Sequence, residues 1–142
     1  DLDALVVGTG GRPVWIIARQ HPGETMAEWF IEGLLQRLLD PADPVARALL
    51  DSATLYIVPN MNPDGSVMGN LRTNAAGANL NREWLAPSAE RSSEVLAVKN
   101  AIHATGCAAF FDIHGDENLP YVFVAGCEML PEFTPRKAAE AT

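Results

Sequence analysis

The sequence has little of several features that would mark particular classes of protein. Only 2 of its 142 residues are cysteine, too few for a disulfide scaffold, and Cys107 and Cys127 each lie among apolar residues, which is typical of buried, reduced thiols. Lys and Arg number 10 against 18 Asp and Glu, so no basic stripe is available for nucleic acid. No apolar run approaches the ~20 residues of a membrane span, and no signal peptide opens the chain. We therefore expect a cytoplasmic protein without nucleic-acid or membrane partners.

The chain does have the composition of a folded domain, with 48% hydrophobic and 20% charged residues. Short apolar runs rich in β-branched residues alternate with segments whose apolar residues recur every three or four positions. Strands are expected at 14–18, 53–59, 107–115 and 120–126, and helices at 24–39, 45–52 and 87–106. This alternation predicts an α/β fold, with a largely parallel or mixed central sheet and flanking helices. Nothing in the sequence indicates an oligomeric state.

Polar clusters follow three of these strands. The first is His21 with Glu24, the second is the Asn- and Arg-rich segment 60–86, and the third is Asp112 with His114. Long irregular segments such as 60–86 are usually functional in compact domains. Because the carboxyl ends of parallel strands meet at one edge of a sheet, the three clusters are expected to lie together there.

The pair His21 and Glu24 has two interpretations. Glu24 can be an acid that favours a helix N-terminus, with His21 a polar turn residue. Alternatively both are metal ligands, since two imidazoles and one carboxylate with an open position make a catalytic zinc set, and His114 supplies the second imidazole. Asp112 lies on the same strand face as His114, so it can orient that ligand or lie in the site itself. His103 is expected near the C-terminus of a helix, where its interaction with the helix dipole is favourable.

The segment 60–86 supplies Arg72 and Arg82 together with several asparagines, in a chain that is otherwise acidic. The planar fork of arginine suits a carboxylate, and asparagine adds an uncharged donor. A metal beside such groups suits a substrate with a carboxylate close to a bond that the metal polarises. The plainer interpretation makes "NPDG" a turn and Arg82 a surface ion pair, and for "NPDG" we adopt it.

Together these residues resemble the zinc metallocarboxypeptidases, specifically their cytosolic-carboxypeptidase-like branch, which has many bacterial members. "HPGE", "PNMNPDG", "GNLRTNAAGANLNREW" and "DIHGDE" occur in the family's order between residues 21 and 117. The resemblance implies a carboxypeptidase-like fold and one zinc ion held by His21, Glu24 and His114. It also implies that Arg72 stabilises the carbonyl oxyanion while Asn81 and Arg82 bind the C-terminal carboxylate of a peptide or protein. The branch further suggests substrates that end in acidic residues.

Two departures from the family pattern stand out. Asn79 occupies the position where an aspartate commonly accepts a bond from the first ligand histidine; an amide oxygen can still accept it, without the charge. The family's general base, a glutamate far downstream, has no counterpart in this sequence, and an upstream β domain is not seen either. We therefore expect residues 1–142 to be part of a single catalytic domain, and this chain alone to bind metal better than it catalyses.

Two other functions also fit parts of this pattern. The aspartoacylase and succinylglutamate desuccinylase group shares an His-x-x-Glu pair, an Asn-Arg pair and a later histidine, but cleaves N-acyl amino acids. "NMNPDG" and the arginine of "GNLR" favour the peptidase. A metal- or peptide-binding module without catalysis is the other alternative.

Overall fold

The computed structural model describes residues 1–116, 118–119 and 121–126. Its strands form one sheet in the order β1-β3-β2-β4. They are β1 (Leu5–Val7), β2 (Arg12–Ala18), β3 (Ala53–Val58) and β4 (Ala109–Ile113). The central strand β2 runs parallel to both β3 and β4, while the short β1 is antiparallel to β3. The predicted α/β fold with a largely parallel, mixed sheet is confirmed.

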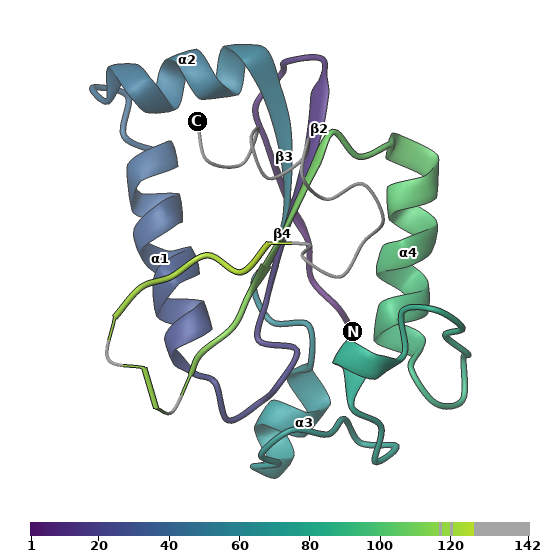
Figure 1. Ribbon diagram of the computed structural model, residues 1–142. Coiled ribbons are helices and arrows are strands. Elements are labelled where there is room, and N and C mark those ends of the chain that lie inside the picture. The colour runs from purple at the N-terminus through teal and green to yellow at the C-terminus, as the bar shows by residue number, and fades with distance from the viewer. Residues whose placement is uncertain (117, 120, 127–142) are drawn as a thin grey trace.

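Helices cover both faces of this sheet, as Figure 1 shows. They are α1 (Met26–Leu38), α2 (Pro44–Ser52), α3 (Pro63–Met68) and α4 (Ser93–Thr105), with a 3₁₀ turn η1 at Leu80–Arg82. In the view of Figure 1, α1 and α2 lie on one side of the sheet and α4 on the other, while α3 lies below one end of the strands. None of the helices in the described ranges is both long and apolar enough to cross a membrane.

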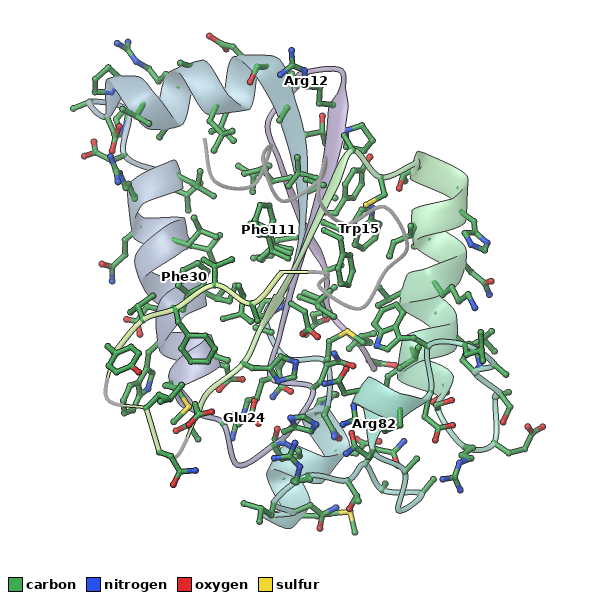
Figure 2. All side chains as sticks on the ribbon, in the orientation of Figure 1. Arg12, Trp15, Glu24, Phe30, Arg82 and Phe111 are labelled. Atoms are coloured by element: carbon green, nitrogen blue, oxygen red, sulfur yellow. The ribbon has the colours of Figure 1, made fainter. Side chains whose placement is uncertain are left out.

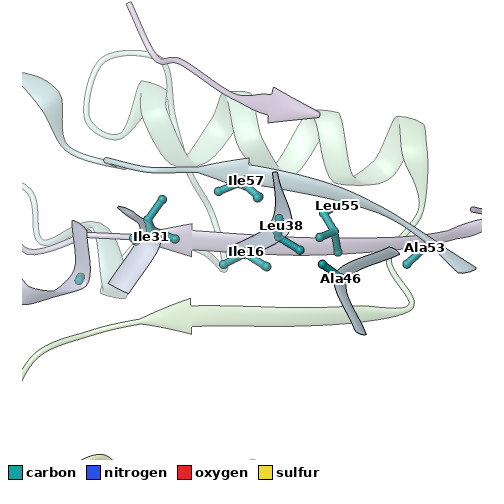
Figure 3. Packing of buried hydrophobic residues seen from close by; sticks show 9 residues of the cluster. Ile16, Ile31, Leu38, Ala46, Ala53, Leu55 and Ile57 are labelled. Carbon is teal, nitrogen blue, oxygen red and sulfur yellow. The ribbon is translucent and has the colours of Figure 1, made fainter. Parts of the chain in front are cut away.

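The side chains of the central strands alternate between two cores. Ile16, Leu55 and Ile57 pack against Ile31 and Leu38 of α1 on one face, as seen in Figure 3. The period of two along a strand sends neighbouring residues to opposite faces, so a strand buried on both sides is apolar throughout. This explains why "VWIIA" reads as a continuous apolar run.

On the opposite face, Trp15 and Ile17 of β2 pack with Val95 and Val98 of α4. Ile17 is fully buried, at 0% exposure. The two cores therefore fix β2 from both sides, and the residues that follow its carboxyl end start from a rigid position.

Three expectations from the sequence were wrong in the described residues. Residues 121–126 form no strand, and the segment 60–86 contains the helix α3 where a turn was expected at "NPDG". Asn62 caps α3 by accepting from the backbone N–H of Gly65, and Pro63 occupies its first turn. Cys107 is exposed rather than buried, because it lies in the turn between α4 and β4; Cys127 lies outside the described residues.

Candidate metal centre

The turn that follows β2 carries the first predicted ligand. Directly after Ala18 the backbone of Arg19 turns into the left-handed region, at φ 56°, which is uncommon for a residue other than glycine. The Arg19 guanidinium then bridges the turn, donating from Nε to the carbonyl of Pro22 at 2.8 Å and pairing with Glu28 on α1. The turn is thereby held against α1, with His21 inside it.

The structure brings the three predicted ligands together. Nδ1 of His21 lies 2.7 Å from Oε1 of Glu24, and Nδ1 of His114 lies 2.8 Å from Oε2 of the same carboxylate. One ligand atom from each residue falls within 4.8 Å of the other two. Glu24 precedes α1, whose first-turn acid is Glu28, so its carboxylate serves the two histidines rather than the helix N-terminus.

The far nitrogen of each imidazole has its own partner. Nε2 of His21 lies 3.1 Å from Oδ1 of Asn79, and Nε2 of His114 lies 2.8 Å from Oδ2 of Asp112. Both partners are acceptor oxygens, so they favour a proton on Nε2 and leave Nδ1 able to bind a metal. Two imidazoles directed by such acceptors and one carboxylate are a donor set that fits zinc.

The charges of the site are strongly coupled. Burial by itself raises the pKa of Glu24, but hydrogen bonds from His114 and from the Gly115 N–H, together with the charges of the two histidines, lower it to about 2. The pKa of His114 is raised to about 9, chiefly by its hydrogen bond to Asp112 and then by that to Glu24, against the effect of burial. The site therefore holds an ionised carboxylate beside a positive charge.

Arg72 reaches the same carboxylate from the segment after α3. Its guanidinium lies 3.7 Å from Oε1 of Glu24 and 3.4 Å from Nε2 of His21. Two glycines allow this approach. The Gly23 N–H donates to the carbonyl of Leu71 at 3.0 Å, and a Cβ on Gly23 would lie 2.7 Å from the Leu71 side chain. A Cβ on Gly65 would lie 2.6 Å from the backbone carbonyl of Thr73.

These groups line a pocket of about 320 Å³. Its lining residues are His21, Glu24, Arg72, Asn81, His114, Gly115, Asp116, Asn118 and Phe123. Among the described residues, Asn81 is therefore part of the pocket wall, whereas the neighbouring Arg82 is not. Arg82 is exposed and donates to the carbonyl of Asn81 at 3.2 Å. Figure 2 shows Glu24 and Arg82 at the same end of the molecule, opposite Arg12.

Sequence reasoning missed several residues of the site. Asp116, Asn118 and Phe123 line the pocket from the segment after β4, where no periodicity or spacing marks them. Gln20 contacts Asp112, and Trp84 contacts Gln20, each from a distant part of the chain. The only sequence signal for Gln20 was its place next to a predicted ligand. His103 lies in the last turn of α4, as predicted.

Comparison with known proteins places these residues in context. The profile of the zinc carboxypeptidase family matches residues 4–132. An uncharacterised protein of Zymomonas mobilis is 60% identical over 131 residues, covering 92% of this chain and 34% of the relative. Cytosolic carboxypeptidase 4 of Mus musculus is 39% identical, covering 83% of this chain and 11% of that protein. A metallo-carboxypeptidase structure from Pseudomonas aeruginosa, in complex with (2-guanidinoethylmercapto)succinic acid, is 54% identical with a TM-score of 0.95, covering 99% of this chain and 39% of that one.

The chain thus spans about a third of the length of these bacterial relatives and a smaller share of the mouse protein. The predicted carboxypeptidase-like fold is confirmed by the Pseudomonas structure. An aspartoacylase family protein from Mesorhizobium loti is 19% identical with a TM-score of 0.62, covers 80% of this chain and 34% of its own, and shares the fold alone.

Proposed function

The chain belongs to the zinc carboxypeptidase family, and on that basis we propose that the protein containing it is a zinc-dependent carboxypeptidase, which hydrolyses the last peptide bond of peptides or proteins. The observation that carries this proposal is the meeting of Nδ1 of His21, Nδ1 of His114 and the Glu24 carboxylate within 4.8 Å. In the proposed site these three residues hold one zinc ion. Asn79 and Asp112 orient the two imidazoles through their Nε2 atoms.

The proposed roles of zinc and of Arg72 follow from the positions of their charges. Zinc, when bound, lowers the pKa of a coordinated water toward neutrality and polarises the scissile carbonyl. Arg72 is half exposed and borders the ligand carboxylate, so its guanidinium is free to stabilise the charge that develops on the carbonyl oxygen. It is the residue that we assign to catalysis within this chain.

Recognition of the substrate's end is assigned to Asn81 and Arg82. Asn81 lines the pocket, and the Arg82 guanidinium extends from the same 3₁₀ turn. An amide donor and a planar guanidinium suit the terminal carboxylate, which selects the last peptide bond for attack. The succinic acid part of the compound bound by the Pseudomonas relative is also a carboxylate ligand, which supports this assignment.

We extend the proposal to the class of substrate and the compartment. Acidic C-terminal residues are the preference that the resemblance to the cytosolic branch implies. The names of the mammalian relatives and the two sparse cysteines support a cytoplasmic location.

The first experiment measures zinc per chain in the full-length protein, together with release of C-terminal residues from a peptide panel with and without chelator. The panel pairs peptides ending in Glu or Asp with otherwise identical ones ending in Leu or Lys. We expect one zinc per chain, chelator-sensitive release, and loss of the zinc in His21→Ala and Glu24→Ala. His103→Ala, on the exposed end of α4, is the matched control and should keep both.

The alternatives give different results. Release of acyl groups from N-acyl amino acids, without release from any peptide, would identify an acyl-amino-acid hydrolase. Zinc without either activity would indicate a binding module. Unchanged zinc content in His21→Ala and Glu24→Ala would show that this site does not hold the metal.

A further inference from the structure

We propose that Gln20 is a positioning residue for the metal site: its buried amide fixes the Asp112 carboxylate, which in turn orients the imidazole of His114, while Trp84 holds the amide from the other side. This inference rests on the proposed zinc site. It adds two residues, Gln20 and Trp84, whose contacts make the third ligand dependent on segments far from it in the sequence.

Gln20 has only one amide orientation that satisfies its neighbours. The side chain is fully buried, at 0% exposure, so both ends of the amide need a partner. The indole Nε1 of Trp84 can only donate, and it lies 2.8 Å from Oε1 of Gln20. The carboxylate of Asp112 accepts, and its Oδ2 lies 2.6 Å from Nε2 of Gln20. Trp84 therefore determines which end of the amide faces Asp112.

Asp112 depends on this amide for its own orientation. Its Oδ2 accepts from Nε2 of Gln20 at 2.6 Å and from Nε2 of His114 at 2.8 Å. Its other oxygen, Oδ1, is buried and has no hydrogen-bond partner within the described residues. A carboxylate held by one oxygen can rotate if one of its two donors is lost. Removing the Gln20 amide therefore frees Asp112, and with it the ring of His114, whose Nδ1 must face Glu24.

Trp84 is anchored independently of Gln20. Its ring packs edge to face against Phe110 of β4, with centroids 5.6 Å apart, and its backbone carbonyl accepts from Nζ of Lys99 on α4 at 2.8 Å. The Nε1–H of Trp84 thus approaches Gln20 from a fixed ring. Trp84→Phe keeps an aromatic ring there, removes the donor and leaves a smaller side chain.

A purely structural role for this network would change stability without changing the metal. A positioning role predicts an effect on zinc affinity and on ligand geometry in protein that remains folded. Substitution of residues that orient metal ligands typically costs about 10- to 100-fold in metal affinity. Because Gln20 acts through Asp112, its loss should matter little once Asp112 is already unable to orient His114.

The experiment uses the full-length protein and four variants: Gln20→Met, Trp84→Phe, Asp112→Ala, which leaves no acceptor for His114, and the double variant Gln20→Met/Asp112→Ala. Zinc affinity is measured by competition with a chromophoric chelator, and the geometry of the ligands by the absorption spectrum of the cobalt(II) form. The matched controls are Gln36→Met and Trp29→Phe on α1. Among the described residues Gln36 bonds only Glu32, and Trp29 is 70% exposed. Circular dichroism establishes that each protein is folded.

We expect Gln20→Met to lower zinc affinity about tenfold and to alter the cobalt spectrum, Trp84→Phe to act in the same direction, and the controls to match the wild type. The double variant should bind zinc about as tightly as Asp112→Ala alone. Wild-type affinity and spectrum in folded Gln20→Met, or losses that simply add in the double variant, would overturn the proposal. If Gln20→Met does not fold, Trp84→Phe alone and combined with Asp112→Ala tests the proposal by the same criteria.

These outcomes are separable from those of the proposed function. Zinc binding without peptide hydrolysis would contradict the carboxypeptidase activity and leave the affinity comparison intact. Conversely, if the enzyme is active but its zinc affinity is unchanged in the Gln20 and Trp84 variants, only the positioning role is refuted.

Discussion

Zinc binding is expected to displace a proton from His114. In the metal-free protein its pKa is raised to about 9, first by the hydrogen bond to Asp112 and next by that to Glu24, while burial acts in the opposite direction. At pH 8 a group with this pKa is about nine-tenths protonated, whereas an ordinary imidazole is almost entirely neutral. Only the neutral ring can offer Nδ1 to a metal.

The magnitude follows from the difference between the pKa and the working pH. Each unit is worth about 1.4 kcal/mol, so deprotonating His114 costs the metal about 3 kcal/mol at pH 7 and about half of that at pH 8. Because the raised pKa stabilises the protonated form, zinc affinity should rise with pH until about 9 and fall about tenfold for each unit below it.

The assay is calorimetric titration of zinc at pH 8 in two buffers of different ionisation enthalpy, which counts the protons released for each zinc bound. Asp112→Ala removes the hydrogen bond that is the largest cause of the raised pKa, so it should release distinctly fewer protons from His114 than the wild type. Protons from other groups are common to both proteins and cancel in the difference. His103→Ala is the control and should match the wild type. Equal proton release in the wild type and Asp112→Ala would refute the reasoning.

Two further predictions concern stability and the approach of Arg72. Glu24 has its pKa lowered to about 2 from 4.5, so its contribution of about 3 kcal/mol to metal-free stability should be present above pH 4.5 and lost as the pH falls toward 2. The free energy of unfolding, measured with denaturant at pH 5 and pH 3, should therefore change less with pH in Glu24→Gln than in the exposed control Glu32→Gln. The same change in both variants would contradict this prediction. Gly65→Ala should lose about 1 to 3 kcal/mol of stability and lower kcat, because the new Cβ would lie 2.6 Å from the backbone carbonyl of Thr73 and displace the segment bearing Arg72. Gly33→Ala on α1, where a Cβ meets nothing within 4 Å, should keep full activity, and equal behaviour of the two alanine variants would count against the close packing.

The sequence alone was sufficient for the elements whose signal is local. "VWIIA" is apolar throughout because β2 is buried on both faces, and the three- and four-residue spacing of the apolar residues identified α1. The same local signals failed where an element is short. The helix α3 spans six residues, too few to show a period, and its start at Asn62 and Pro63 also reads as a turn. The apolar run at 121–126 has strand-like composition, but the described sheet ends at β4 and does not pair with it.

For the site, the sequence determined which residues stand at strand ends, because parallel strands place their carboxyl ends at one edge. The sequence predicts His21, Glu24 and His114 as metal ligands in this way, and by the resemblance to the zinc metallocarboxypeptidases. Only the tertiary structure shows the contacts of Gln20 and Trp84, which lie 92 and 28 positions from Asp112 and leave no local pattern. Hydrogen bonds between buried polar groups depend on where the fold brings distant segments together, and no period or spacing in the chain records that.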